Sequence, residues 1–103
     1  MDHMETQAQA VERLRSDGFV ADFEVSEDGH LTIGDRRWDP SHVTIAELVR
    51  FEGMSDPDDE AMLLALVTSD EVRGTLVMPY GPSMTEAQVS AAQHLLLDRR
   101  NRP

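Results

Sequence analysis

The chain has 103 residues, a length typical of one domain, and its 40% hydrophobic and 28% charged residues are the balance of a folded globule. It contains no cysteine, which excludes disulfides and thiolate zinc sites, and 20 carboxylates against nine arginines give a net charge of −11. So negative a surface disfavours direct nucleic-acid binding, and no apolar run is long enough to span a membrane. We expect one cytoplasmic domain over residues 1–103, with frayed tails at 1–5 and 99–103.

The first predicted element is a helix that begins after Thr6. Thr6 and Gln9 have the spacing of a capping box, and Gly18 ends the helix because glycine readily takes the left-handed conformation. A half-buried strand follows over 19–25, where apolar and polar residues alternate. The turn 27–29 and a short return strand complete a predicted hairpin.

The middle of the chain has two segments of less certain type. Residues 34–40 have the composition of a loop, with Trp38 covering one end of the core. Residues 43–52 place apolar side chains on one face of a strand, but Glu47 interrupts that face. Thr44 and Glu47 could instead cap a short helix. We predict a strand.

The second half contains an apolar run at 61–67 that periodicity alone cannot assign to a helix or a buried strand. A strand is predicted over 74–78, and 79–82 ends the sheet. Ser83 and Glu86 have capping-box spacing at the start of a last helix. Its apolar stripe is predicted to hold Val89, Ala92 and Leu96, with Leu95 beside it. The fold class is therefore α+β: a helix, a four- to five-stranded mainly antiparallel sheet and a C-terminal helix, with both helices on one face.

Three short strings resemble a family of small bacterial proteins. They are residues 50–60 (RFEGMSDPDDE), residues 73–77 (RGTLV) and Tyr80-Gly81, within a similarity that runs from about Val11 to Tyr80. Members often carry the label "phosphoribosylpyrophosphate synthetase". The resemblance implies a hairpin, and therefore a strand at 61–67 with 68–71 as its loop. The chain contains no glycine-rich phosphate loop and no lysine, which are features typical of phosphoryl transfer.

Two groups of residues are candidate sites. Closely spaced acids on a loop can converge on a hard cation such as Mg²⁺ or Ca²⁺, and the acids in question are Asp56, Asp58, Asp59 and Glu60. The alternative is a solvated turn or the acidic start of a helix. An anion could bind where the last strand meets the last helix, near Arg50, Arg73, Tyr80 and Ser83. The alternative there is that Tyr80 covers the edge of the core.

Three functions are compatible with this pattern. The first is a protein-binding or regulatory module without a required cofactor, whose partner is a protein with a basic surface or a second copy in a weak homodimer. The second is a binder of, or an enzyme acting on, a phosphorylated metabolite with Mg²⁺. The third is a nucleic-acid mimic in which carboxylates imitate phosphates. The sequence contains no recognisable catalytic set and favours the first.

Overall fold

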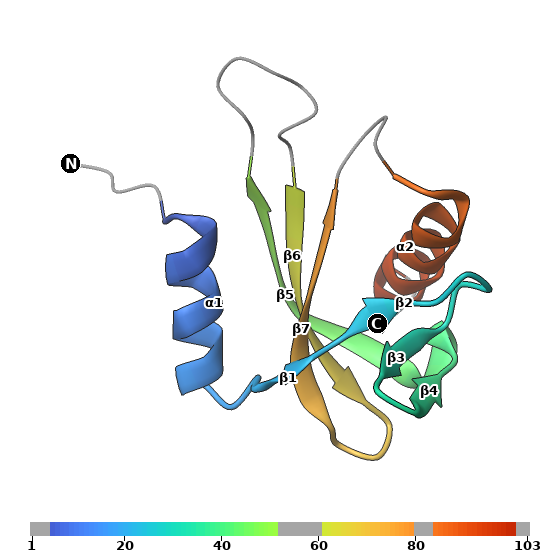
Figure 1. Cartoon of the computed structure of the whole chain (residues 1–103), viewed down its shortest axis with the longest axis horizontal. Coiled ribbons are helices and arrows are strands. Elements are labelled where there is room, and N and C mark those ends of the chain that lie inside the picture. Colours follow the sequence, from blue (N-terminus) through green and yellow to red (C-terminus); the bar gives the residue numbers. More distant parts are fainter. Residues whose placement is uncertain (1–4, 52–60, 80–83, 101–103) are drawn as a thin grey trace.

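The computed structural model describes residues 5–51, 61–79 and 84–100, which form two helices and two sheets (Figure 1). In chain order the elements are α1 (Gln7–Ser16), β1 (Ala21–Asp22), β2 (Glu24–Val25), β3 (Leu31–Ile33), β4 (Arg36–Trp38), the 3₁₀ helix η1 (Pro40–His42), β5 (Val43–Phe51), β6 (Ala61–Thr68), β7 (Arg73–Pro79) and α2 (Glu86–Arg100). The predicted α+β class is confirmed.

The larger sheet has the strand order β1-β7-β6-β5. β5, β6 and β7 pair antiparallel, and the two-residue β1 pairs parallel to β7. The strands predicted at 43–52, 61–67 and 74–78 are thereby confirmed. The register of β5 on β6 shifts between Ile45 and Glu47, so the charged residue that interrupted the apolar pattern follows a β-bulge.

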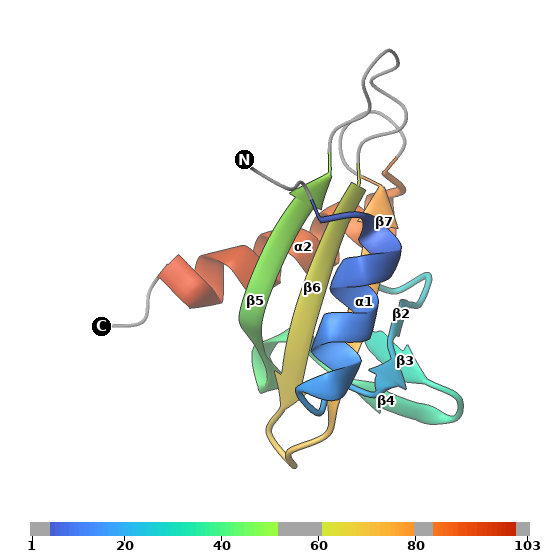
Figure 2. The ribbon, with the colours of Figure 1, turned by 90° about the vertical axis from the view of Figure 1, so that its left-hand side faces the viewer.

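The two helices cover opposite faces of this sheet, which corrects the prediction that they share one. Successive side chains of a strand point to opposite faces, so β6 is buried on both. Leu63 and Ala65 pack against Ala10 and Leu14 of α1. Leu64 and Leu66 belong to the second cluster, which also holds Ala91, Ala92 and Leu95 of α2. Figures 1 and 2 show α1 and α2 on the two sides of β6. A strand that is apolar on every residue is the pattern of a sheet buried on both faces.

A second, three-stranded sheet has the order β2-β3-β4 and is antiparallel throughout. It confirms the predicted hairpin, but the strand predicted over 19–25 is divided. The chain leaves the larger sheet at Asp22, buries Phe23 with an amide hydrogen bond of 2.8 Å to the Thr75 carbonyl, and joins the smaller sheet at Glu24. Gly74 permits this crossing, since a Cβ there would lie 2.4 Å from the Ala21 carbonyl oxygen.

The predicted loop at 34–40 is wrong, because residues 36–38 form β4. Trp38 is buried, with its ring edge-to-face against Phe23 at a centroid distance of 5.6 Å. It does cover the core, as predicted, but from a strand. Gly34, at φ +58°, makes the tight β3–β4 turn that the composition alone did not distinguish from a loop.

Both helices begin with a capping box. The predicted pair in α1 is confirmed, with reciprocal bonds between Thr6 and Gln9. In α2 the reciprocal pair is Thr85 and Gln88, while the predicted cap Ser83 lies outside the described residues. The predicted apolar stripe is also corrected in part: Ala92 is buried, but Leu96 is only half-buried and Val89 is 38% exposed. The other buried residues are Ala91 and Leu95, which was predicted beside the stripe.

Candidate functional site

The structure separates two arginines of the predicted anion site. Arg50 lies opposite Met62, and Arg73 opposite Val67, five residues further along β6, or about 17 Å. Arg50 and Arg73 therefore stand at opposite ends of the sheet and do not surround one small anion. Arg73 lies over the ring of Phe19 at 5.9 Å. Tyr80 and Ser83 lie outside the described residues, as do the metal candidates Asp56, Asp58, Asp59 and Glu60, so those assignments stay predictions.

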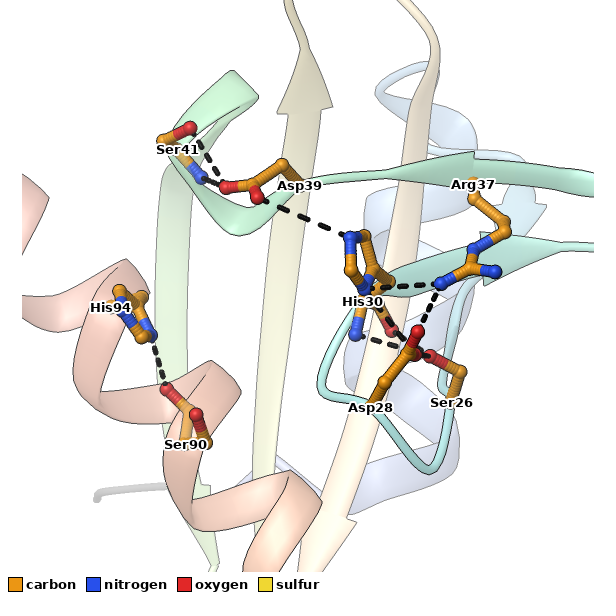
Figure 3. A network of polar contacts seen from close by, with 8 residues as sticks. All are labelled: Ser26, Asp28, His30, Arg37, Asp39, Ser41, Ser90 and His94. Atoms are coloured by element: carbon orange, nitrogen blue, oxygen red, sulfur yellow. Dashed lines mark hydrogen bonds and ion pairs between the residues drawn. The ribbon is translucent and has the colours of Figure 1, made fainter.

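A different cluster of chemistry-bearing side chains gathers on the smaller sheet around His30 (Figure 3). The Nδ1 atom of His30 lies 3.2 Å from Arg37 Nη2 and 3.2 Å from Asp28 Oδ1, and its Nε2 atom lies 4.0 Å from Asp39 Oδ2. An arginine can only donate, so Nδ1 accepts from Arg37 when that nitrogen carries no proton. A proton on Nδ1 would instead be donated to Asp28.

The turn between β2 and β3 brings this cluster together. The amide of His30 donates to Ser26 Oγ at 3.1 Å, and the Ser26 hydroxyl and Arg37 both donate to the carboxylate of Asp28. Gly29, at φ +82°, is buried against Ser90 of α2. The turn is thus closed by its own side chains and seated on α2.

A second carboxylate reaches His30 from the start of η1. Asp39 accepts hydrogen bonds from the backbone amide of Ser41 at 2.9 Å and from its hydroxyl at 2.8 Å, and so caps the 3₁₀ helix. These two bonds hold the pKa of Asp39 below its ordinary value. In the same way, the Ser26 hydroxyl and Arg37 hold the pKa of Asp28 well below its ordinary value.

The hydrogen bonds made by the serine hydroxyls determine which chemistry the cluster can support. In a nucleophilic site a serine hydroxyl faces the ring nitrogen of a histidine that takes its proton. Here Ser26 and Ser41 donate to carboxylates and not to the imidazole of His30. Across residues 5–51, 61–79 and 84–100, no group of three or more histidine, aspartate or glutamate side chains is arranged to hold a metal ion. The described geometry is that of a turn held in place by hydrogen bonds between its own side chains.

Beside the cluster lies an open hollow of about 290 Å³, lined mostly by polar residues of η1, β5, β6 and the β6–β7 turn, with Val67 as its apolar member. Three of the hydroxyls in its lining, those of Ser41, Thr44 and Thr68, are already engaged in hydrogen bonds. Thr44 Oγ1 donates to the Val67 carbonyl at 3.2 Å, and Thr68 Oγ1 donates to Asp70 while accepting from the amide of Val72. His42, which is exposed, also lines the hollow.

Asp70 ties the smaller sheet to the larger one. Its carboxylate accepts from Trp38 Nε1 at 2.9 Å, from Arg36 at 2.5 Å and from Thr68 at 2.5 Å. Arg36 also lies over the Trp38 ring, 4.7 Å from its centroid. The bonds from Thr68 and Trp38 lower the pKa of Asp70.

The remaining surface charge has one prevailing sign. Arg13 is held by Glu5 at 2.8 Å and by Glu47 at 2.7 Å, and Arg36 and Arg37 are held by Asp70 and Asp28. By contrast, several exposed carboxylates make no ion pair with any described residue. Three of them lie on the smaller sheet and its turns: Glu24, Glu27 and Asp35.

Sequence reasoning missed the grouping around His30 and the role of Asp70. Asp28 lies in the predicted turn 27–29 and His30 directly follows it, and that spacing was available as a signal. Asp39 and Arg37 approach His30 only because β4 pairs with β3, and this segment was predicted to be a loop. No sequence signal connects Asp70 with Trp38, which are 32 residues apart.

Comparison of the chain with protein families, curated proteins and solved structures finds no match. Among the described helices, none is both long and apolar enough to cross a membrane.

Proposed function

We propose that this chain is a cytoplasmic protein-binding or regulatory module whose partner presents a basic surface. One observation supports the proposal above the others. The arginines of α1 and β4 are held by carboxylates of the same chain, whereas Glu24, Glu27 and Asp35 are exposed and make no ion pair within the described part of the chain. The charges that the smaller sheet offers to a partner are therefore negative.

Charge complementarity of this kind acts mainly on partner choice and on the rate of association. A basic protein surface is attracted, while a nucleic-acid backbone is repelled. The smaller sheet also presents these acids on a backbone that its own hydrogen bonds hold in place, so binding requires little ordering of the loop.

Two other functions, and the family resemblance, stay predictions from the sequence. A phosphorylated metabolite with Mg²⁺ would use the acids at 56–60 or the turn at 80–83, which lie outside the described residues. A nucleic-acid mimic would need acids spaced along one extended face, and part of the second acidic stretch lies in the same undescribed segment.

The test is an affinity capture with two variants of equal charge. The first replaces the three acids of the smaller sheet (Glu24→Gln, Glu27→Gln and Asp35→Asn). The second replaces three exposed acids on the helices and the end of α1 (Glu12→Gln, Asp17→Asn and Glu86→Gln). Proteins captured from the host's extract by the wild type are identified by mass spectrometry, and purified partners are titrated at several salt concentrations.

We expect a partner with a basic surface whose affinity falls with added salt and falls about tenfold in the smaller-sheet variant, with a change of less than about twofold in the helix variant. Equal losses in both variants would show that only net charge matters and would contradict the proposed surface. A melting-temperature shift with Mg²⁺, nucleotides or sugar phosphates, in the absence of a captured protein, would favour the metabolite function.

A further inference from the structure

The outer edge of β5 is an open strand edge. β5 is nine residues long and stands last in the order β1-β7-β6-β5, and no described strand pairs with its outer side. The bulge between Ile45 and Glu47 interrupts its first half. Beyond the bulge, Glu47–Phe51 pairs with β6 without a further shift, so these five residues offer a regular row of backbone donors and acceptors.

This edge has few of the features that prevent exposed edge strands of natural proteins from pairing with one another. It contains no proline or lysine, and the side chains of Leu48, Val49 and Phe51 are half-buried. Its one acid, Glu47, is bonded to Arg13 of α1, and Arg50 supplies a positive charge. In a chain of net charge −11, β5 is a segment of zero formal charge.

α2 extends beyond this edge. The helix is 15 residues long, about 22 Å at 1.5 Å per residue, and the residues that it buries against the sheet are Ala91, Ala92 and Leu95. Figure 2 shows its C-terminal turns continuing past β5, where the molecule provides no strand beneath them. A strand added alongside β5 would lie under those turns.

We propose that the occupant of this edge is a second copy of the chain, paired antiparallel through Glu47–Phe51 about a two-fold axis at Val49. Such an axis stands perpendicular to the sheet, so opposed side chains lie on the same face and their positions are symmetric about residue 49. Val49 then faces its own copy, Leu48 faces Arg50, and Glu47 faces Phe51. No charged residue of β5 lies opposite a like charge.

The same symmetry places both copies of α2 on one face of a continuous eight-stranded sheet, with each overhanging end above the other copy's strands. A second copy is thus the occupant that supplies both a strand to pair with β5 and a sheet beneath α2. The pairing segment is short, so the interface is small and the dimer is weak.

Salt distinguishes this dimer from binding to a basic partner. Two bodies of the same large negative charge repel each other, so raising the salt concentration from about 0.1 M to about 1 M, which shortens the Debye length from about 10 to about 3 Å, tightens the dimer severalfold. Binding to a basic protein weakens over the same range.

The first experiment measures the dissociation constant by analytical ultracentrifugation for two matched variants. Val49, Leu63 and Val77 form one row across the same face of the sheet, so Val49→Lys and Val77→Lys add the same charge at its two ends. Val49→Lys sets like charges opposite each other at the axis and raises the dissociation constant about tenfold or more, while Val77→Lys changes it less than about twofold. Circular dichroism and melting curves confirm that both variants fold.

The second experiment uses the absence of cysteine. Val49→Cys places two thiols opposite each other at the axis, and a short bis-maleimide links them in the dimer; Val77→Cys is the control. Efficient linkage of Val49→Cys alone supports the proposal. A wild-type chain that stays monomeric up to about 1 mM, equal linkage of both variants, or dissociation caused by Val77→Lys would each overturn it. None of these results depends on the basic partner, because the smaller-sheet variant leaves β5 unchanged.

Discussion

The four-stranded sheet buries Leu63, Leu64 and Leu66 to an exposure of 2% or less, whereas Leu31 and Trp38 are the buried residues on the strands of the three-stranded sheet. In place of apolar burial, the smaller sheet is held by two carboxylates that accept several hydrogen bonds each: Asp28 of its own β2–β3 turn and Asp70 of the β6–β7 turn of the larger sheet. The three long strands of the larger sheet have seven to nine residues each, enough for apolar side chains to be covered on both faces. Strands of two or three residues cannot bury enough surface, so polar contacts and the neighbouring sheet must hold them.

The comparison predicts that truncation in the larger sheet has the largest effect. Leu64→Ala removes a side chain that is 2% exposed from the cluster beneath α2, and we expect the free energy of unfolding to fall by about 2–5 kcal/mol. Val25→Ala, at a half-buried site of the smaller sheet, is the control and costs about 1 kcal/mol. Urea unfolding followed by circular dichroism measures both. Equal losses would show that the two sheets depend on apolar burial alike.

The second prediction concerns Asp70 and acid. Its pKa is lowered in the folded protein, so its contribution to stability is present above the ordinary value of 3.8 and is lost as the pH falls through the lower folded value. The emission of Trp38, the only tryptophan, therefore changes below about pH 3.8 while the circular dichroism of the larger sheet is retained further into acid. Asp70→Asn brings the emission change to neutral pH.

Asp35→Asn is the matched control for that variant, since Asp35 is an exposed acid of the β3–β4 turn, next to the strand that holds Trp38, with no ion pair among the described residues. It leaves the emission of Trp38 unchanged at neutral pH. Simultaneous loss of emission and circular dichroism in acid would mean that the two sheets unfold as one unit, and would contradict the distinction between them.

The smallest effect is expected for a polar contact on the larger sheet. Arg13 bridges Glu5 and Glu47, and the hydrogen bonds that it donates, together with its positive charge, lower the pKa of both carboxyls. Its side chain is nevertheless 38% exposed. Arg13→Ala therefore lowers the free energy of unfolding by less than about 1 kcal/mol, and less at high salt. Arg15→Ala, whose ion pair with Asp22 spans 3.8 Å, is the control with no measurable change. A loss as large as that of Leu64→Ala would contradict the conclusion that the larger sheet is stabilised mainly by apolar burial.

The predictions that held from sequence rest on interactions within a few residues. Thr6 and Gln9 cap α1 through bonds across three positions, and the turn at 27–29 closes through Gly29. Such contacts need no other part of the chain. The strand at 61–67 was correct for another reason, since the apolar run by itself allowed a helix and only the resemblance favoured a strand.

The charges of the candidate surface were predictable from the sequence only in part. The net charge of −11 and the acid-rich first hairpin were evident from the residues. The residues did not show which acids are neutralised. Asp28 and Asp70 are paired with arginines of β4, and composition did not reveal that strand. The exposed set Glu24, Glu27 and Asp35 is what remains after that pairing.

The sequence by itself determined the α+β class, the strand at 74–78, the cap of α1 and the sign of the surface, since each follows from composition or from neighbours along the chain. Only the tertiary structure decided that the helices cover opposite faces, that the strand over 19–25 divides at Phe23 between two sheets, and that Trp38 meets Asp70. These outcomes depend on contacts between residues far apart in sequence. A local sequence pattern does not specify which distant part of the chain will pack against it.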